Sequence, residues 1–183
     1  MKPSPTAAVP TLSELAESLS DLLDRYAAGY ERLLLALGEQ EAALRQADGA
    51  GVERVAKSQA EILAGLRKLD EVRCPLVNAA AAALPSLMMN GRRTTPITLR
   101  EIAGSLPVAG SESLRTKAAR VRRLAEDAQQ RSRVVAGATR AMLGHAEGLL
   151  RHVAQKLSHA GTYSASGTVQ AGRAVVSSLD LRS

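Results

Sequence analysis

Apolar residues, most of them leucine, recur every three or four positions in the first part of the chain, which is the spacing of one face of an α-helix. Steps of three and four alternate, with one extra step of four between Tyr26 and Tyr30. The segment Thr11-Leu12-Ser13-Glu14 is a capping box, in which the Thr11 hydroxyl and the Glu14 carboxylate satisfy free amides at a helix start. We therefore expect a first helix from this box to about Ala47. Its apolar positions are Leu12, Leu15, Leu19, Leu22, Tyr26, Tyr30, Leu33, Leu37 and Leu44.

A second segment with heptad spacing follows a turn that we expect at residues 48–51, where glycines tolerate positive φ angles. Such a short turn places consecutive helices side by side and antiparallel, so the two segments predict a long helical hairpin. Pro75 lacks an amide donor and is expected to kink the second helix. The seam positions, two of them polar, are Val52, Val55, Gln59, Ile62, Leu66, Leu69, Arg73 and Leu76.

Two further helices are predicted after a connector over residues 85–96. A capping box at Thr98-Leu99-Arg100-Glu101 opens a short helix that Gly104 and Pro107 close. A third long helix is expected from about residues 111–113 to Ala160. Its apolar side consists of Leu114, Val121, Leu124, Ala128, Val135, Met142, Leu149, Val153 and Leu157.

These elements predict an all-α fold, an elongated antiparallel bundle or coiled coil of three long helices with one short connecting helix. The length of 183 residues favours one domain. Aromatic residues make up only 2% of the chain, which argues against a conventional β-sandwich or barrel. We expect residues 1–10 to be a disordered lead-in, residues 11–160 to form the helical domain, and residues 161–183 to be a flexible tail.

Charge is divided between the predicted helices. Residues 14–41 carry seven acids against two bases, and residues 115–140 carry eight bases against two acids. The first and third long helices should therefore attract each other, which influences register and partner choice more than stability. The formal net charge of +6 also permits attraction to nucleic acid, to an anionic membrane or to an acidic partner.

Candidate chemistry is sparse. His145, His152 and His159 recur every seven residues, but successive members lie about 10.5 Å apart along a helix axis, too far to share one metal ion. We interpret them as a half-solvated helix face. Cys74 has no histidine at a motif spacing, so a buried small hydrophobic residue is the favoured interpretation over a nucleophile. No catalytic triad order or phosphate-binding loop is present, so we expect neither an enzyme nor a cofactor.

A basic stretch over residues 115–133 is rich in arginine and lysine, the side chains that most often contact nucleic-acid phosphates. No aromatic residues interleave with it, and pairing with the acidic first helix is the favoured interpretation. Gly137, Gly144 and Gly148 permit close helix approach or weaken the helix. No run of about 18 uncharged apolar residues and no apolar signal segment is present, so neither membrane insertion nor Sec export is expected. The single cysteine suits a reducing compartment, and hence the cytoplasm.

Taken in order, the motifs resemble the FlgN-type flagellar export chaperones over roughly residues 12–170. The resemblance rests on the stretch Leu33 to Leu44, the stretch Lys57 to Arg73 that ends in LDEVR, the segment Thr98 to Ile102, and Tyr163 with Gly167.

The resemblance implies a cytoplasmic, non-enzymatic chaperone. Such a protein binds the C-terminal helices of the hook-associated proteins of the hook–filament junction and delivers them to the flagellar type III export gate. It further implies that the third long helix and the tail bind the partner, and that Tyr163 matches a residue that contacts the gate.

A partner surface on the third helix and tail also suits the residues, because their many small side chains leave apolar surface incompletely covered. A basic helical module that binds nucleic acid and a coiled-coil scaffold remain the alternatives. The expected partner-binding residues are Met142, Leu149, Leu150, Val153, Leu157, Tyr163, Val175, Val176 and Leu179.

Overall fold

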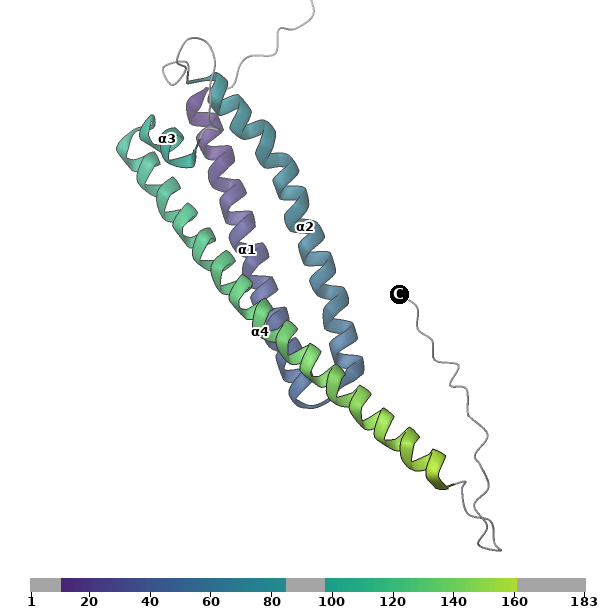
Figure 1. Cartoon of the computed structure of the whole chain (residues 1–183). Helices are drawn as coiled ribbons and strands as arrows, with labels where there is room; N and C mark the ends of the chain where they lie inside the picture. The colour runs from purple at the N-terminus through teal and green to yellow at the C-terminus, as the bar shows by residue number, and fades with distance from the viewer. Residues whose placement is uncertain (1–10, 85–97, 161–183) are drawn as a thin grey trace, which may run out of the picture. The chain divides into compact units, whose positions relative to one another are not determined.

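The structure, a computed structural model, describes residues 11–84 and 98–160, with side chains described as far as residue 157. Four helices account for almost all of these residues: α1 (Leu12–Arg45), α2 (Gly49–Ala82), α3 (Leu99–Gly104) and α4 (Val108–Ala160) (Figure 1). The described ranges contain no strand. The prediction of an all-α bundle of three long helices and one short helix is therefore confirmed. The connector at residues 85–96 lies outside the described residues.

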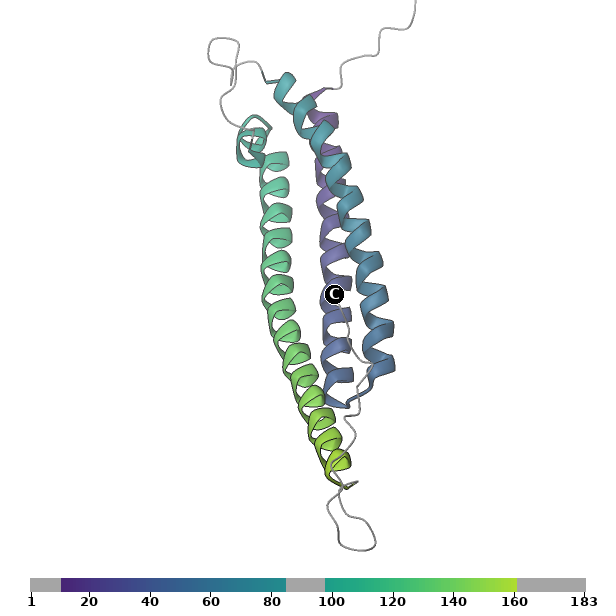
Figure 2. The same ribbon diagram turned by 45° about the vertical axis from the view of Figure 1, so that its right-hand side comes forward.

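The chain divides into two compact units, one up to Val135 and one from Ala136 onward. In the first unit, α1 lies between α2 and the first part of α4, as two views show (Figures 1 and 2). The turn between α1 and α2 makes these two helices antiparallel, as the sequence predicts. The described part of the second unit is the rest of α4.

Both predicted capping boxes are present. At the start of α1, the Thr11 amide donates to Glu14 Oε2 at 2.8 Å, and the Glu14 amide donates to Thr11 Oγ1 at 3.3 Å. The hydrogen bond from the Thr11 amide, with a smaller contribution from the Thr11 hydroxyl, lowers the pKa of the Glu14 carboxyl. Thr98 and Glu101 make the same pair of bonds at the start of α3, at 2.7 and 3.3 Å. The sequence therefore locates both helix starts to the residue.

The turn between α1 and α2 comes earlier than predicted. Helix α1 ends at Arg45, Gln46 and Ala47 form the turn, and α2 already begins at Gly49. The Asp48 carboxylate accepts a hydrogen bond from the Gly51 amide at 2.9 Å, so Asp48 caps α2 and draws the glycines into its first turn. The one non-glycine residue with positive φ in the described ranges is Ala47, at 53°.

Two other predictions need correction. Helix α4 begins at Val108, before the predicted residues 111–113, because the Pro107 carbonyl accepts from the Ser111 amide at 2.9 Å and proline suits a helix start. Cys74, expected to be buried, is exposed, because it lies beside the seam residues of α2 rather than among them. Helix α2 runs through Pro75 as one helix to Ala82.

The core of the first unit is aliphatic and consists of two clusters, both built on α1. One cluster joins Leu22, Tyr26, Leu33 and Leu37 of α1 to Ile62, Leu66 and Leu69 of α2 and to Ala128 and Val135 of α4. The other joins Leu15 and Leu19 to Ala80 and Leu84, to Ile102 and Ala103, and to Leu114. No polar side chain is buried in the described ranges. Leucine burial therefore holds these helices together.

Helices α1 and α2 approach closely at Gly29. A Cβ atom at this position would lie 2.6 Å from Leu66 Cδ2, closer than such atoms come in proteins. Leu66 therefore occupies the space that a side chain at position 29 would need.

A polar network around Asp70 bridges the α1–α2 seam. The Tyr26 hydroxyl donates to Asp70 Oδ1 at 2.8 Å, and Arg73 Nε lies 3.1 Å from the same oxygen. The Tyr26 ring is almost fully buried, and this burial, together with the hydrogen bond to Asp70, raises the pKa of Tyr26 from 10.0 to about 12. The hydrogen bond from Tyr26 lowers the pKa of Asp70.

Tyr26→Phe should lower the free energy of unfolding by about 1 kcal/mol, because it removes this hydrogen bond and leaves the ring packed. Urea unfolding followed by circular dichroism measures the loss, with Tyr30→Phe, a partly buried tyrosine of the same helix, as the control. The parent should also lose stability from pH 10 to about 12, since the unfolded state releases the Tyr26 proton first. If Tyr26→Phe loses the same stability over this pH range, the loss does not come from the Tyr26 hydroxyl.

Candidate functional site

Helix α4 carries one apolar row from end to end. Leu114, Val121, Ala128, Val135, Met142 and Leu149 follow one another at steps of seven residues. In the first unit, Leu114, Ala128 and Val135 are buried and Val121 is half-buried. In the second unit, every described side chain from 136 to 157 is exposed except Thr139, which is half-buried. The apolar row thus continues into a part of α4 that no described element covers.

The candidate site is this exposed apolar surface, which we call the α4 stripe. At 3.6 residues per turn its members span about 120° of the helix circumference, the width typical of a buried helix face. The exposed fractions of their side chains range from 39% for Met142 to 71% for Leu150. The α4 stripe consists of Met142, Leu143, Leu149, Leu150, Val153 and Leu157.

Five of the predicted partner-binding residues share this surface: Met142, Leu149, Leu150, Val153 and Leu157. The prediction missed Leu143, although its distance of seven residues from Leu150 places it on the same face. The other four predicted residues, Tyr163, Val175, Val176 and Leu179, lie outside the described residues.

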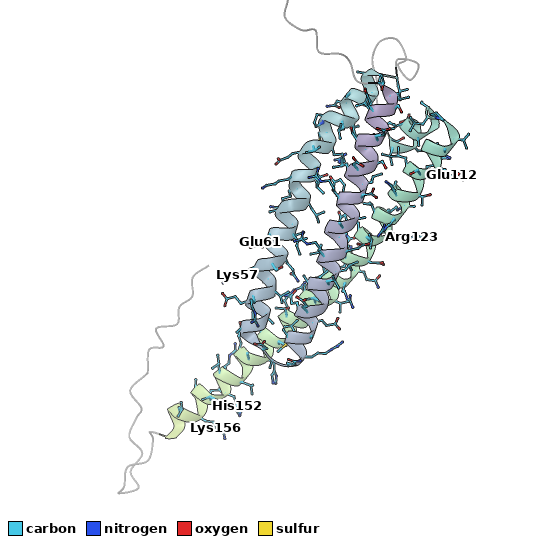
Figure 3. The ribbon with its side chains drawn as sticks, turned by 180° about the vertical axis from the view of Figure 1, so that it is seen from behind. Lys57, Glu61, Glu112, Arg123, His152 and Lys156 are labelled. Atoms are coloured by element: carbon cyan, nitrogen blue, oxygen red, sulfur yellow. The ribbon has the colours of Figure 1, made fainter. Side chains whose placement is uncertain are left out.

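Polar and charged residues border the α4 stripe on both sides. On the helix circumference His145, His152 and Lys156 fall along one edge, and Arg140, Glu147 and Arg151 fall along the other. Figure 3 labels His152 and Lys156 on this part of the helix. The described residues include no group of histidine, cysteine or acidic side chains that could hold a metal ion.

Three of the four glycines of α4 have open space beside them in the described part of the chain. A Cβ atom at Gly137, Gly144 or Gly148 would have no neighbour within 4 Å. Of the two predicted roles for these glycines, close helix approach or a weakened helix, the first is not observed in the described part of the molecule.

The basic stretch of α4 pairs with α1, as its charge predicts. Lys117 Nζ lies 2.6 Å from Asp24 Oδ2, and also donates to the Ser20 hydroxyl. Arg120 contacts Glu31 at 2.6 Å, and Arg131 reaches Glu41 at 4.0 Å. These ascending pairs show that α1 and the first part of α4 run parallel. Three of the side chains considered for phosphate contacts thus already face carboxylates of α1.

Two shallow grooves lie along the α1–α4 seam of the first unit. One is lined by residues that include Tyr30, Leu33 and Gln129, and the other by residues that include Leu34 and Val134. The sequence analysis did not find them, because a groove depends on how far apart the two helices stand. Both are open and border the ion pairs.

The arrangement defines a helical protein whose longest helix carries an exposed apolar face. The chain matches the family described as FlgN protein over residues 15–171, and it belongs to this family. It is accordingly a flagellar export chaperone, and the family is not one of enzymes. No curated protein and no solved structure matches it. None of the described helices is long and apolar enough to cross a membrane.

The pair Arg120–Glu31 tests how the basic and acidic helices attract each other. Arg120→Glu and Glu31→Arg should each lower the free energy of unfolding, and the double variant should recover about 0.2–1 kcal/mol, the range measured for exposed pairs. Urea unfolding at low and high salt measures the coupling, which salt should weaken.

Arg123→Glu is the matched control for this pair, because no carboxylate of α1 contacts Arg123 in the described part of the chain. If the double variant loses as much free energy of unfolding as the two single variants together, the pair has no attractive role.

Proposed function

We propose that this chaperone binds the C-terminal helices of flagellar hook-associated proteins with the α4 stripe and residues 161–183, and delivers them to the type III export gate. It would act in the cytoplasm, before export. The observation that supports the binding role most directly is the exposure of six large apolar side chains on one face of α4. Family membership supports the flagellar partner.

An amphipathic helix is the partner that such a surface fits. Soluble proteins rarely leave long apolar stripes uncovered unless something binds there, and an amphipathic helix buries its own apolar face when it docks. Each leucine-sized side chain that leaves water contributes about 1.5–3 kcal/mol before the costs of association. Six such residues supply enough free energy for specific binding, and the partner's apolar face is covered in turn.

The two alternatives receive less support. A nucleic-acid-binding role depends on residues 115–133, and Lys117, Arg120 and Arg131 of that stretch face acids of α1. A coiled-coil scaffold would also use the α4 stripe, but with a second copy or another structural chain. Binding to a hook-associated segment distinguishes the chaperone from both.

Leu150→Ser should weaken binding of the C-terminal segments of hook-associated proteins by about 10- to 100-fold, because a serine cannot replace the apolar surface that the partner covers. Isothermal titration calorimetry with purified segments measures the change. Leu35→Ser is a closely matched control, since Leu35 is 70% exposed on α1 and Leu150 is 71% exposed on α4.

The control variant should bind within about threefold of the parent affinity. Circular dichroism should show that both variants keep the helicity of the parent, because both side chains are exposed. Equal losses in the two variants would place the binding surface elsewhere.

Tyr163→Ala should impair delivery to the gate more than partner binding. A co-isolation assay with the cytoplasmic part of the export gate measures the first effect, and calorimetry with a hook-associated segment measures the second. Tyr163→Phe, which keeps the ring, separates a role of the ring from a role of the hydroxyl. A variant that loses partner affinity but retains gate binding contradicts this division of roles.

A further inference from the structure

Four polar side chains of α4 that the structure describes share one position of the seven-residue repeat, and Leu124 and Ala138 occupy the same position in the repeats between them. Lys117 and Arg131 are separated by two repeats, His145 follows after two more, and His152 follows after another. Residues at one heptad position present their side chains in the same direction relative to the apolar row of the helix. The groups that Lys117 and Arg131 contact therefore indicate which groups suit His145 and His152.

Lys117 and Arg131 both face carboxylates of a leucine-rich helix. Lys117 Nζ contacts Asp24 Oδ2 at 2.6 Å, and Arg131 Nε lies 4.0 Å from Glu41 Oε2. Both acids belong to α1, which also covers Ala128 and Val135 of the apolar row. In the first unit, the apolar row of α4 is thus covered by an apolar helix with acids beside its leucines.

The α4 stripe shows the same pattern without a partner. His145 and His152 are exposed, and Lys156 falls along the same edge. Residues 136–160 contain Arg140, Arg151 and Lys156 against the single acid Glu147, a formal charge of +2 with the histidines neutral. The surface that remains uncovered is therefore apolar at its centre and basic along its border.

Neither a second α4 nor residues 161–183 supplies acids that match this surface. A second α4 would bring the same basic border and repel the first. Residues 161–183 contain Arg173 and Arg182 against Asp180. An acidic occupant matches the charge of this surface, and these two candidates are basic.

We propose that the helix received by the α4 stripe carries carboxylates beside its apolar face, and that these carboxylates face His145 and His152 as Asp24 and Glu41 of α1 face Lys117 and Arg131. This specificity rests on the proposed chaperone role of the stripe. Imidazole donates a hydrogen bond to a carboxylate in either protonation state and adds charge attraction when protonated. The histidines thus select among apolar helices by the charge along their edges.

Two synthetic helical peptides with the same leucine stripe test this specificity, one bordered by glutamates and the other by lysines. Fluorescence anisotropy with the full chain should show at least tenfold tighter binding of the glutamate peptide at low salt, and a smaller ratio at high salt. Leu150→Ser should weaken both peptides, which shows that they bind on the α4 stripe. Equal affinities, or no binding of either peptide, overturn the proposal.

The double variant His145→Glu with His152→Glu should reverse the preference toward the lysine peptide. Both histidines are exposed, and glutamate favours helix at least as well as histidine, so the fold is retained. The double variant Arg123→Glu with Arg133→Glu adds acids to the exposed part of α4 in the first unit and should keep the preference of the parent. A reversal in both double variants means that net charge alone decides, which overturns the proposal.

Binding of a hook-associated segment is measured in parallel, so that the two proposals fail separately. A segment that binds tightly, while the peptides show no charge preference, overturns the role of the histidines and leaves the chaperone role standing. Peptides that discriminate by charge, while no hook-associated segment binds, overturn the choice of partner and retain the specificity of the surface. A dimer in sedimentation that Leu150→Ser dissolves would make a second copy the occupant and overturn the acidic partner.

Discussion

The burial of the leucines of α1 is the interaction on which the rest of the structure depends. This helix contributes ten buried residues, whereas α2, of the same length, contributes five. Both hydrophobic clusters of the first unit include α1 leucines, and every other described helix of that unit packs into one or both of them. Polar contacts such as the Tyr26–Asp70 hydrogen bond and the ion pairs to α4 lie at the edges of this packing. They adjust register and orientation around an apolar centre that already holds the helices together.

Most of this fold could be predicted from the sequence, because its signals are local. A capping box needs only residues three apart, and a leucine stripe needs only its own helix, so the starts of α1 and α3 and the buried face of α1 are predicted correctly. The errors fall where two local signals compete. Gly49 and Gly51 suggested a turn, but the Asp48 carboxylate caps α2 and places both glycines in its first turn. Pro107 was expected to close α3, but it also marks the start of α4.

The sequence could predict most residues of the candidate face and that apolar surface stays uncovered on α4, but not where along the helix the exposure begins. Periodicity shows that Val135 and Met142 share a helix face, but it does not show that one is buried and the other exposed. That difference depends on tertiary packing. Because α1 has 34 residues and α4 has 53, α1 is too short to cover the whole apolar row. The length mismatch of the predicted helices was the available signal. The prediction that Cys74 is buried was wrong for a related reason, because residue type says little about which side of a helix faces the core.

The short turn at Gln46 and Ala47 also has a consequence for the order in which the protein folds. The pairing of α1 with α2 is local in sequence, so the hairpin can close as soon as α2 has been synthesised. Translation at about 5–20 residues per second then needs roughly 4–16 s more to reach the end of α4. During this interval the side of α1 that later receives α4 is open to solvent. Asp24, Glu31 and Glu41 border that side, and charges beside an exposed apolar face oppose aggregation in general.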